Sequence, residues 1–457
     1  MMRRTSMLMT LITMGALLLA ACGTATAPTA GDPAVGVATT AAEAPASSAE
    51  PVRLQFMGWG SPSEQEVFQT LIDKYKQDHP GVEIDYILVP PGEFLQKLTT
   101  LAAADELPDV FYMGSDWFSA WVTKDIMLPV EDYIDASDLE RIWPRARDLY
   151  RYDGTTVGSG KVYALPKDLG PWVMVYNKDL FDKHGVAYPP SDGSWTWDQA
   201  LDAWQKMTVQ LPDGTYESYG VGDYSLEAAV WSNGADFLNA DHNRVMVDDP
   251  KFSEALQFVR DLSCVHRVSP NQTERASLNT YEMWTKGMLG THVMGPWDQP
   301  VFWDLPFNWD IAPFPSSPAT GTPASWTGSM GFGVSAKTAH PEEAVELARY
   351  FSIDEGGQKT NYELGQAVPN LVEMAKGEFL EMEQSPASRQ IFLDNIENWG
   401  RPTLGWYTSN DQWIDTMWQE MAPVWSCERS ADEWGAEWAP KLTETLTREP
   451  QVPTILP

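Results

Sequence analysis

Strands and amphipathic helices alternate at the start of the ordered chain. Residues 52–57 and 82–88 alternate apolar and polar side chains, and this period of two predicts β-strands. Apolar residues at helical spacing follow each strand, from Val67 to Tyr75 and from Phe94 to Ala102. The short apolar run 107–112 is typical of a buried parallel strand. This order of elements predicts a parallel sheet in an α/β fold.

Capping residues mark several helix boundaries. We expect Ser63 with Glu66 to cap the first helix, and Thr196 with Gln199 to cap another that runs to residue 207. Gly365 stands where a C-terminal cap is expected for the helix that starts near residue 354. Residues 384–446 read as mostly helical.

Small, aromatic and acidic residues follow two of the predicted parallel strands. Trp59 and Ser61 come after the first strand, and Asp116 comes after the third. Ligands of open α/β sheets bind beyond the carboxyl ends of the strands, so we expect these side chains to contact a ligand. For Asp116 the alternative is a cap on a helix that starts at Trp117.

Two later segments are expected to run between lobes. The extended runs 161–166 and 172–177 are broken by residues 167–171, and residues 313–325 are rich in Pro, Ser, Thr and Gly. Asp168 lies in the first of these crossings. Its carboxylate is a candidate ligand contact, and the alternative is a salt bridge to Lys167 or Lys161.

Tryptophan is unusually frequent, with 21 residues. Many lie among Gly, Ser, Asn, Asp or Pro in contexts typical of loops, where a flat ring can hold a ligand. Trp231 with Asn233, and Trp297 with Asp298, are such cases. Five C-terminal tryptophans recur at helical spacing, which favours core packing for Trp413, Trp418, Trp425, Trp434 and Trp438.

The formal net charge of −33 indicates a surface that repels nucleic acid and anionic lipid headgroups and suits a neutral or cationic partner. Cys264 and Cys427 remain after Cys22. In an oxidising compartment they favour one disulfide, with two buried free thiols as the alternative. We find no GxSxG or HExxH motif and predict no catalytic residue, metal site or cofactor.

The N-terminal residues are typical of an exported protein. Arg3 and Arg4 precede an apolar run that ends in Leu19-Ala20-Ala21-Cys22. This run is similar to a bacterial lipobox, which implies a signal peptide over 1–21 and a lipid on Cys22; an ordinary cleaved signal is the alternative. Residues 22–50 are then expected to form a lipidated, flexible tether, because they contain almost no large apolar side chain.

Four later runs resemble the maltose-binding group of extracellular solute-binding proteins. They are Val175-Tyr176-Asn177-Lys178-Asp179-Leu180-Phe181, the stretch 287–297 ending in Met294-Gly295-Pro296-Trp297, the stretch 326–334 and the stretch 341–358. Their order and spacing cover nearly all of residues 51–457.

The resemblance implies an α/β, two-lobe, periplasmic-binding-protein-like fold of type II with three interlobe crossings. These would fall near 166–172, 313–327 and 365–370. Lobe one would comprise 51–167 plus 326–367, and lobe two 168–325 plus 368–457.

The resemblance also implies a function: capture of a carbohydrate between closing lobes and delivery to an ABC importer. We expect a non-enzymatic monomer outside the cytoplasm, anchored through the lipid on Cys22, with permease subunits as partners. Position 297 matches the stacking aromatic of the group, and Trp406 matches another. The full set of expected ligand contacts is Trp59, Ser61, Asp116, Asp168, Trp231, Asn233, Trp297, Asp298, Trp326, Gly328 and Trp406.

Two other classes of function stay open from the sequence. A binding protein for a different solute, such as a polyamine, a peptide or a metal, is one alternative, because the acidic surface keeps a cationic ligand open. The less favoured alternative is an extracellular enzyme acting on glycans, which would need a close pair of carboxylates; the sequence, with 64 acidic residues, does not exclude one.

Overall fold

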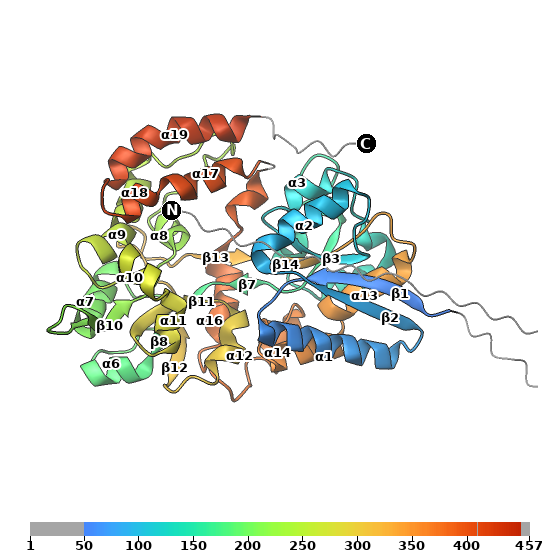
Figure 1. The fold of residues 1–457 in the computed structure, drawn as a ribbon, viewed down its shortest axis with the longest axis horizontal. Coiled ribbons are helices and arrows are strands. Elements are labelled where there is room, and N and C mark those ends of the chain that lie inside the picture. Colours follow the sequence, from blue (N-terminus) through green and yellow to red (C-terminus); the bar gives the residue numbers. More distant parts are fainter. Residues whose placement is uncertain (1–49, 409, 449–457) are drawn as a thin grey trace, which may run out of the picture. The chain divides into compact units, whose positions relative to one another are not determined.

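Two five-stranded sheets organise the computed structural model, which describes residues 50–408 and 410–448 (Figure 1). The signal peptide, the lipobox with Cys22 and the tether lie outside the described residues. The first sheet has the order β2-β1-β3-β14-β6, and the second β12-β8-β11-β10-β9. Within the described ranges, no helix has both the length and the apolar character needed to cross a membrane.

In the first sheet three neighbouring parallel strands are extended by β14 and then β6, and of these five strands β14 alone runs in the opposite direction. β1 pairs in parallel with β2 and β3, whereas β14 runs antiparallel to β3 and β6. This confirms the predicted α/β start of the chain. The strands are Val52–Gly58 (β1), Val82–Leu88 (β2), Val110–Gly114 (β3), Ala164–Pro166 (β6) and Met330–Val334 (β14).

Helices pack on this sheet through the apolar positions that predicted them. Val67, Phe68, Leu71 and Ile72 of α1 are buried. The expected cap was wrong by two residues: Ser61, not Ser63, accepts the hydrogen bond from the Glu64 amide. The helices of this part are Pro62–Asp78 (α1), Pro91–Ala103 (α2), Phe118–Val122 (α3), Val130–Tyr133 (η1), Ala136–Glu140 (α4), Pro144–Asp148 (α5), Pro341–Ser352 (α13) and Glu355–Glu363 (α14), with the hairpin Arg151–Tyr152 (β4) and Lys161–Val162 (β5).

The second sheet is mixed. β10 and β11 are parallel, and β8 lies antiparallel to β11 and β12. The predicted capping box of Thr196 and Gln199 is present at the start of α7. The strands are Val173–Asn177 (β8), Val209–Gln210 (β9), Tyr216–Val221 (β10), Leu289–Met294 (β11) and Trp309–Ala312 (β12). The helices are Lys178–His184 (α6), Trp197–Met207 (α7), Leu226–Ser232 (α8), Pro250–Cys264 (α9), Gln272–Ser277 (α10), Thr280–Thr285 (α11), Pro296–Asp298 (η2) and Gln299–Phe302 (α12).

The chain passes between the sheets along a small third sheet, β15-β13-β7. Its strands are Gly170–Pro171 (β7), Ser325–Gly328 (β13) and Gly400–Arg401 (β15). β7 joins β6 to β8, and β13 joins the second sheet to β14, so Figure 1 shows both between the larger sheets. Thr327 pairs with Pro171 and Gly328 with Gly170. The first two expected crossings therefore lie side by side.

The third expected crossing follows α14. Gly365 has the positive φ of 78° expected of a helix cap, and its carbonyl accepts a hydrogen bond from Gln299 at 3.4 Å. A few residues on, the Asn370 amide donates to the Pro166 carbonyl at 2.6 Å. The segment 365–370 thus contacts both α12 and the end of β6. The residue boundaries of the two lobes stay a prediction.

The C-terminal residues are largely helical, as expected. Trp413 and Trp434 are buried, but Trp418 is 38% exposed, so its assignment to the core was wrong. The elements are Val372–Lys376 (α15), Gln390–Asp394 (α16), the π-helical turn Asn395–Trp399 (η3), Leu404–Tyr407 (η4), Gln412–Glu420 (α17), Ala422–Trp425 (α18) and Ala431–Thr447 (α19).

A disulfide joins Cys264, the last residue of α9, to Cys427, which follows α18. The Cα atoms are 5.7 Å apart. The bridge encloses a loop with a sequence separation of 163 residues. A closed loop of this length restricts the unfolded chain strongly.

We predict that replacing both cysteines by serine lowers the free energy of unfolding by about 2–4 kcal/mol. Guanidinium denaturation of oxidised wild type and of the double variant measures the difference. Wild type treated with a thiol reductant is the control and should approach the variant. An unchanged denaturation midpoint in both would contradict the prediction.

Candidate functional site

A buried lysine lies between two carboxylates at the end of β6. The Lys167 ammonium is 2.9 Å from Glu64 Oε1 and 2.9 Å from Asp168 Oδ2. Burial alone would lower the lysine pKa, but the attraction of Asp168 and Glu64 outweighs it and raises the pKa above its usual range. The ammonium is therefore charged and paired. Asp168 accepts a further hydrogen bond from the Met330 amide at 3.0 Å, which ties β6 to the start of β14.

This cluster forms one wall of a cavity of about 260 Å³, here called the central cavity. Six of the residues expected to contact ligand line it: Trp59, Asp116, Asp168, Trp297, Trp326 and Gly328. They come from the carboxyl ends of β1 and β3, from both crossings and from the turn after β11. The other lining residues are Glu64, Ser115, Lys167, Ser329, Met330, Gln366 and Thr403.

Glycines make room for two of the indoles. A Cβ added to Gly170 would lie 2.4 Å from the Trp297 ring, and one added to Gly295 would lie 2.3 Å from the same ring. A Cβ on Gly328 would lie 2.1 Å from the Trp326 ring. Both rings therefore lie directly against backbone and remain half-buried. This is the arrangement that presents a flat apolar face to a ligand.

Trp59 is held differently, by other aromatic rings. It stacks on Trp117 with ring centroids 6.0 Å apart, and its ring meets Phe94 and Tyr112 edge to face. Such pairs fix a ring without hydrogen bonds. Its orientation is set by packing before any ligand arrives.

The site contains two polar groups that sequence reasoning missed. Gln366 is 1% exposed and Thr403 7% exposed, and both line the central cavity. Neither the amide oxygen and nitrogen of Gln366 nor the Thr403 hydroxyl has a hydrogen-bond partner among the described residues. A buried polar group without a partner is costly, so these atoms are suited to a polar ligand. The only local signal was that Gln366 follows a helix-ending glycine in the expected third crossing.

A second cavity of about 460 Å³, the flanking cavity, adjoins the first and shares Trp59, Asp116, Trp326, Met330 and Thr403 with it. The alternative of a helix cap for Asp116 is not realised, since α3 begins at Phe118 without a side-chain cap. Asp116 faces the cavity and is accessible from its open side. The surrounding protein nevertheless removes much of its water, and this desolvation raises its pKa to about 6.

Asp411, just before α17, also lines the flanking cavity. Burial, with a further contribution from the nearby charges of Asp116 and Asp415, raises its pKa to about 8. Its Oδ1 atom has no hydrogen-bond partner in the described part of the chain. Asp411 is thus a second carboxyl group that the sequence did not single out.

Asp298 lines a third cavity of about 320 Å³, which Trp297 separates from the central one. Its carboxylate accepts a hydrogen bond from the Gly295 amide at 3.0 Å and so holds the turn that carries Trp297. Burial raises its pKa to about 7. The sequence predicted Asp298 to contact the ligand. The structure adds a second role, because Asp298 also fixes the turn that carries Trp297.

Four expected contacts lie outside these three cavities. Ser61 caps α1. The loop expected around Trp231 and Asn233 was wrong, since both lie at the end of α8, with Asn233 fully buried and its amide donating to the Lys251 carbonyl at 2.7 Å. Trp406 lies in η4 and donates to the Leu149 carbonyl at 3.1 Å. These side chains satisfy their polar groups within the protein.

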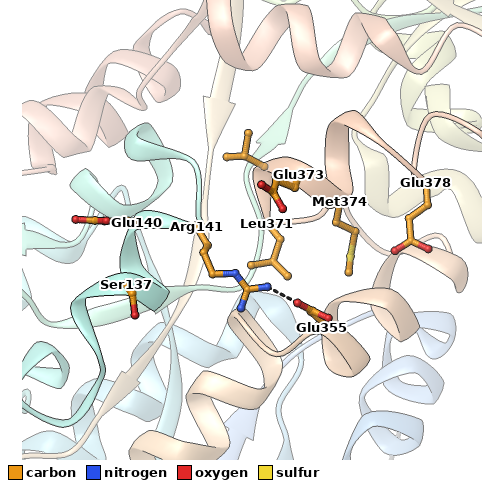
Figure 2. Close-up of a pocket in the computed structure, with 9 residues that line it drawn as sticks. Ser137, Glu140, Arg141, Glu355, Leu371, Glu373, Met374 and Glu378 are labelled. Carbon is orange, nitrogen blue, oxygen red and sulfur yellow. Dashed lines mark hydrogen bonds and ion pairs between the residues drawn. The ribbon is translucent and has the colours of Figure 1, made fainter.

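A cavity of about 820 Å³, larger than these three, lies elsewhere and has a different chemistry (Figure 2). Among the described residues four glutamates and no aromatic side chain line it, and its arginine, Arg141, is paired with Glu355 at 2.5 Å. Size alone therefore does not identify the site. Within the described ranges, no cluster of His, Cys, Asp and Glu side chains is arranged to hold a metal ion.

Comparison with known proteins gives a consistent result. Residues 60–358 match the family described as bacterial extracellular solute-binding protein. A putative binding protein of Brucella abortus is 25% identical over 236 residues, 50% of this chain and 54% of the relative. The maltotriose-binding protein of Pyrococcus abyssi is 25% identical over 301 residues, 64% of this chain and 61% of the relative. The chain thus spans between half and two thirds of the length of these relatives.

Solved structures share the fold. An ABC substrate-binding protein of Listeria monocytogenes, in complex with cycloalternan, superposes with a TM-score of 0.77 at 19% identity, covering 87% of this chain and all of that one (100%). A maltose-bound protein of T. maritima superposes with a TM-score of 0.73 at 20% identity, covering 86% and 100%. These are type II periplasmic-binding-protein-like folds, as expected from the sequence.

We predict that Asp411→Asn stabilises the protein at high pH and not at low pH. The folded protein holds the Asp411 proton up to a pKa of about 8, far above the unfolded value, so ionising it costs stability as the pH rises through that range. The melting temperature of the variant minus that of wild type should increase from about pH 5 to about pH 9. Asp241→Asn, which removes an exposed acid that lines none of the three cavities, is the control. A difference that does not change with pH would contradict the prediction.

Proposed function

The chain belongs to the family of bacterial extracellular solute-binding proteins, and from this we propose that it binds a carbohydrate in the central and flanking cavities and delivers it to an ABC importer. The observation that carries the proposal is the lining of the central cavity: fixed indole faces beside buried polar groups that have no partner. Sugars present C–H faces to aromatic rings and hydroxyl groups to amides and carboxylates.

A sugar hydroxyl both donates and accepts hydrogen bonds, and the polar groups of the central cavity can pair with it in both ways. The Gln366 amide both donates and accepts, and the Thr403 hydroxyl does the same. Asp168 has one oxygen on Lys167 and the other on the Met330 amide, so its geometry is fixed before binding. The names of relatives support the same class of ligand, since a maltotriose-binding and an arabinooligosaccharide-binding protein are among them.

The crossings supply a route to closure. Trp59 and Asp116 follow strands of the first sheet, whereas Trp297 follows β11 of the second. A ligand between them contacts both parts of the protein at once. Bending at β7 and β13 then allows a closed state that only the ligand stabilises.

The remaining parts of the proposal concern location. We place the mature protein outside the cytoplasmic membrane, held by a lipid on Cys22 and by residues 22–50, as a monomer that meets the permease subunits of the importer. The lobes proposed are 51–167 plus 326–367 and 168–325 plus 368–457. The family description supports the extracellular location.

We expect binding without turnover. A glycan hydrolase needs two carboxyl groups on either side of the scissile bond, one of them free to protonate it. In the central cavity Glu64 and Asp168 are both paired with Lys167, and the family to which the chain belongs binds solutes. Asp116 and Asp411 are carboxyl groups of the adjoining cavities that make no ion pair among the described residues, so incubation with oligosaccharides tests them directly. The sugars should be returned intact, and chromatographic detection of products would contradict this part of the proposal.

Mono-, di- and oligosaccharides should be screened by tryptophan fluorescence and by melting temperature. At least one sugar should change the emission and raise the melting temperature, because a ligand that binds only the folded state stabilises it. A complete absence of response across the panel, together with a response to spermidine or to peptides, would overturn the proposal.

Trp297→Ala should weaken binding of the identified sugar by about 1–3 kcal/mol, the worth of a buried aromatic face. Calorimetry measures the dissociation constant of the variant. Trp438→Ala, on α19 and away from the three cavities, is the matched control and should bind as wild type does. An affinity equal to wild type in Trp297→Ala would remove this residue from the site.

A further inference from the structure

The charges around the two adjoining cavities are unbalanced. Lys167 is the one basic side chain among the described residues that line the central cavity, and Glu64 and Asp168 already pair with it. The flanking cavity is lined by four acidic residues and, within the described ranges, by no basic one. These four are Asp116, Glu227, Asp411 and Asp415.

None of the four makes an ion pair within the described part of the chain. Glu227 accepts a hydrogen bond from the Ser225 hydroxyl at 2.9 Å, but Asp411 leaves Oδ1 without a partner. Carboxylates that are partly withdrawn from water and lie near one another repel, which is why Asp116 helps to raise the pKa of Asp411. A cation between them would relieve both the desolvation and the repulsion.

A second and independent observation points to a ligand at this place. The Thr403 hydroxyl lines both cavities, is 7% exposed and has no partner among the described residues. The walls around it are indoles, with Trp59 and Trp326 shared by both cavities. Faces of tryptophan attract cations as well as the C–H faces of sugars.

Resting on the proposed function, we propose that the bound carbohydrate is an amino sugar whose ammonium group lies between Asp116 and Asp411. An ammonium offers three hydrogen-bond donors and one positive charge. It thereby satisfies the open oxygen of Asp411 and offsets the acidic wall. The hydroxyl groups of the same sugar reach Thr403 and Gln366 in the adjoining cavity.

The glycine-backed rings argue for a sugar over a linear polyamine. The indoles of Trp297 and Trp326 pack closely against Gly170, Gly295 and Gly328, which limits their freedom to move. A linear polyamine needs free carboxylates along its length, and Glu64 and Asp168 of the central cavity are already paired with Lys167. The Gln366 side chain is a neutral amide, which both donates and accepts hydrogen bonds. A hydroxyl group can fill both roles, whereas an ammonium group can only donate.

The test uses sugars matched in all but one substituent. Glucose, galactose and cellobiose are each compared by calorimetry with the 2-amino and the 2-acetamido analogue, at a pH where the amine is protonated. We expect the amino member to bind about tenfold or more tightly than its neutral partner, the worth of a charge-assisted hydrogen bond. The acetamido member, which keeps the bulk and loses the charge, should show no such gain.

Variants test whether the preference for amino sugars depends on the carboxylates of Asp116 and Asp411. Asp116→Asn and Asp411→Asn should each reduce the amino-to-neutral affinity ratio toward one. Glu373→Gln removes the same charge at the remote cavity of Figure 2 and should keep the ratio. A ratio that falls equally in all three would show a general effect of net charge and overturn the proposed contact.

The other outcomes separate this inference from the function it rests on. Equal or tighter binding of a neutral or acetylated sugar overturns the amino-sugar inference and keeps carbohydrate binding. Binding of spermidine in place of every sugar overturns both. Circular dichroism spectra that match wild type ensure that a loss in a variant reports the site and not the fold.

Discussion

The Lys167 ammonium and its two carboxylates set the position of the whole site. Glu64 belongs to the first turn of α1, whereas Asp168 follows β6 and also binds the amide that starts β14. Withdrawing three charges from water is costly, and the cost is offset only when all three meet in good geometry. The cluster therefore specifies one arrangement of three segments that are distant in sequence. Trp59, Asp116 and Gly328 take their places around that arrangement.

The third sheet, β15-β13-β7, carries the connections between the two larger sheets and lies next to this cluster. β7 and β13 pair with each other through backbone hydrogen bonds, so in the proposed closure both main connections between the larger sheets would bend together as one ladder. Trp297 lies on Gly170 within this ladder, although it comes from the turn after β11. A ligand that presses on the indole is thus in contact with the segment that bends. In the proposed mechanism the same segment, β7, contacts the ligand-binding indole and takes part in the closing motion.

The sequence predicted elements well where the signal was local. The alternation in β1, the helical spacing in α1 and the capping box of α7 depend on neighbours a few residues apart. It misplaced the cap of α1 because Ser61 and Ser63 offer the same hydroxyl, and the choice between them depends on where β1 releases the chain. Trp231 looked like a loop residue because Gly234 follows it, yet the helix before it continues.

The expected residues that line the central cavity came from three kinds of signal. Trp59 and Asp116 were expected because they follow parallel strands, and Asp168 because it lies in a crossing. Trp297 was expected because it matches the stacking aromatic of the group that the sequence resembles. Gln366, Thr403 and Asp411 were missed because nothing near them in sequence shows that they lack partners. An unpaired buried group is a property of the assembled fold, in which contacts come from hundreds of residues away.

The glycines behind the tryptophans restrict how this site can change over evolution. Any side chain at Gly170 or Gly328 would collide with an indole, so these backbone positions cannot be used to trim the cavity. Replacing the indole instead would remove the platform itself. The polar residues of the two cavities, such as Asp116, Gln366 and Asp411, can instead be exchanged for other acids, amides or hydroxyls without moving the backbone. Descendants of this protein would accordingly keep the aromatic floor and diverge in which substituents of the ring they accept.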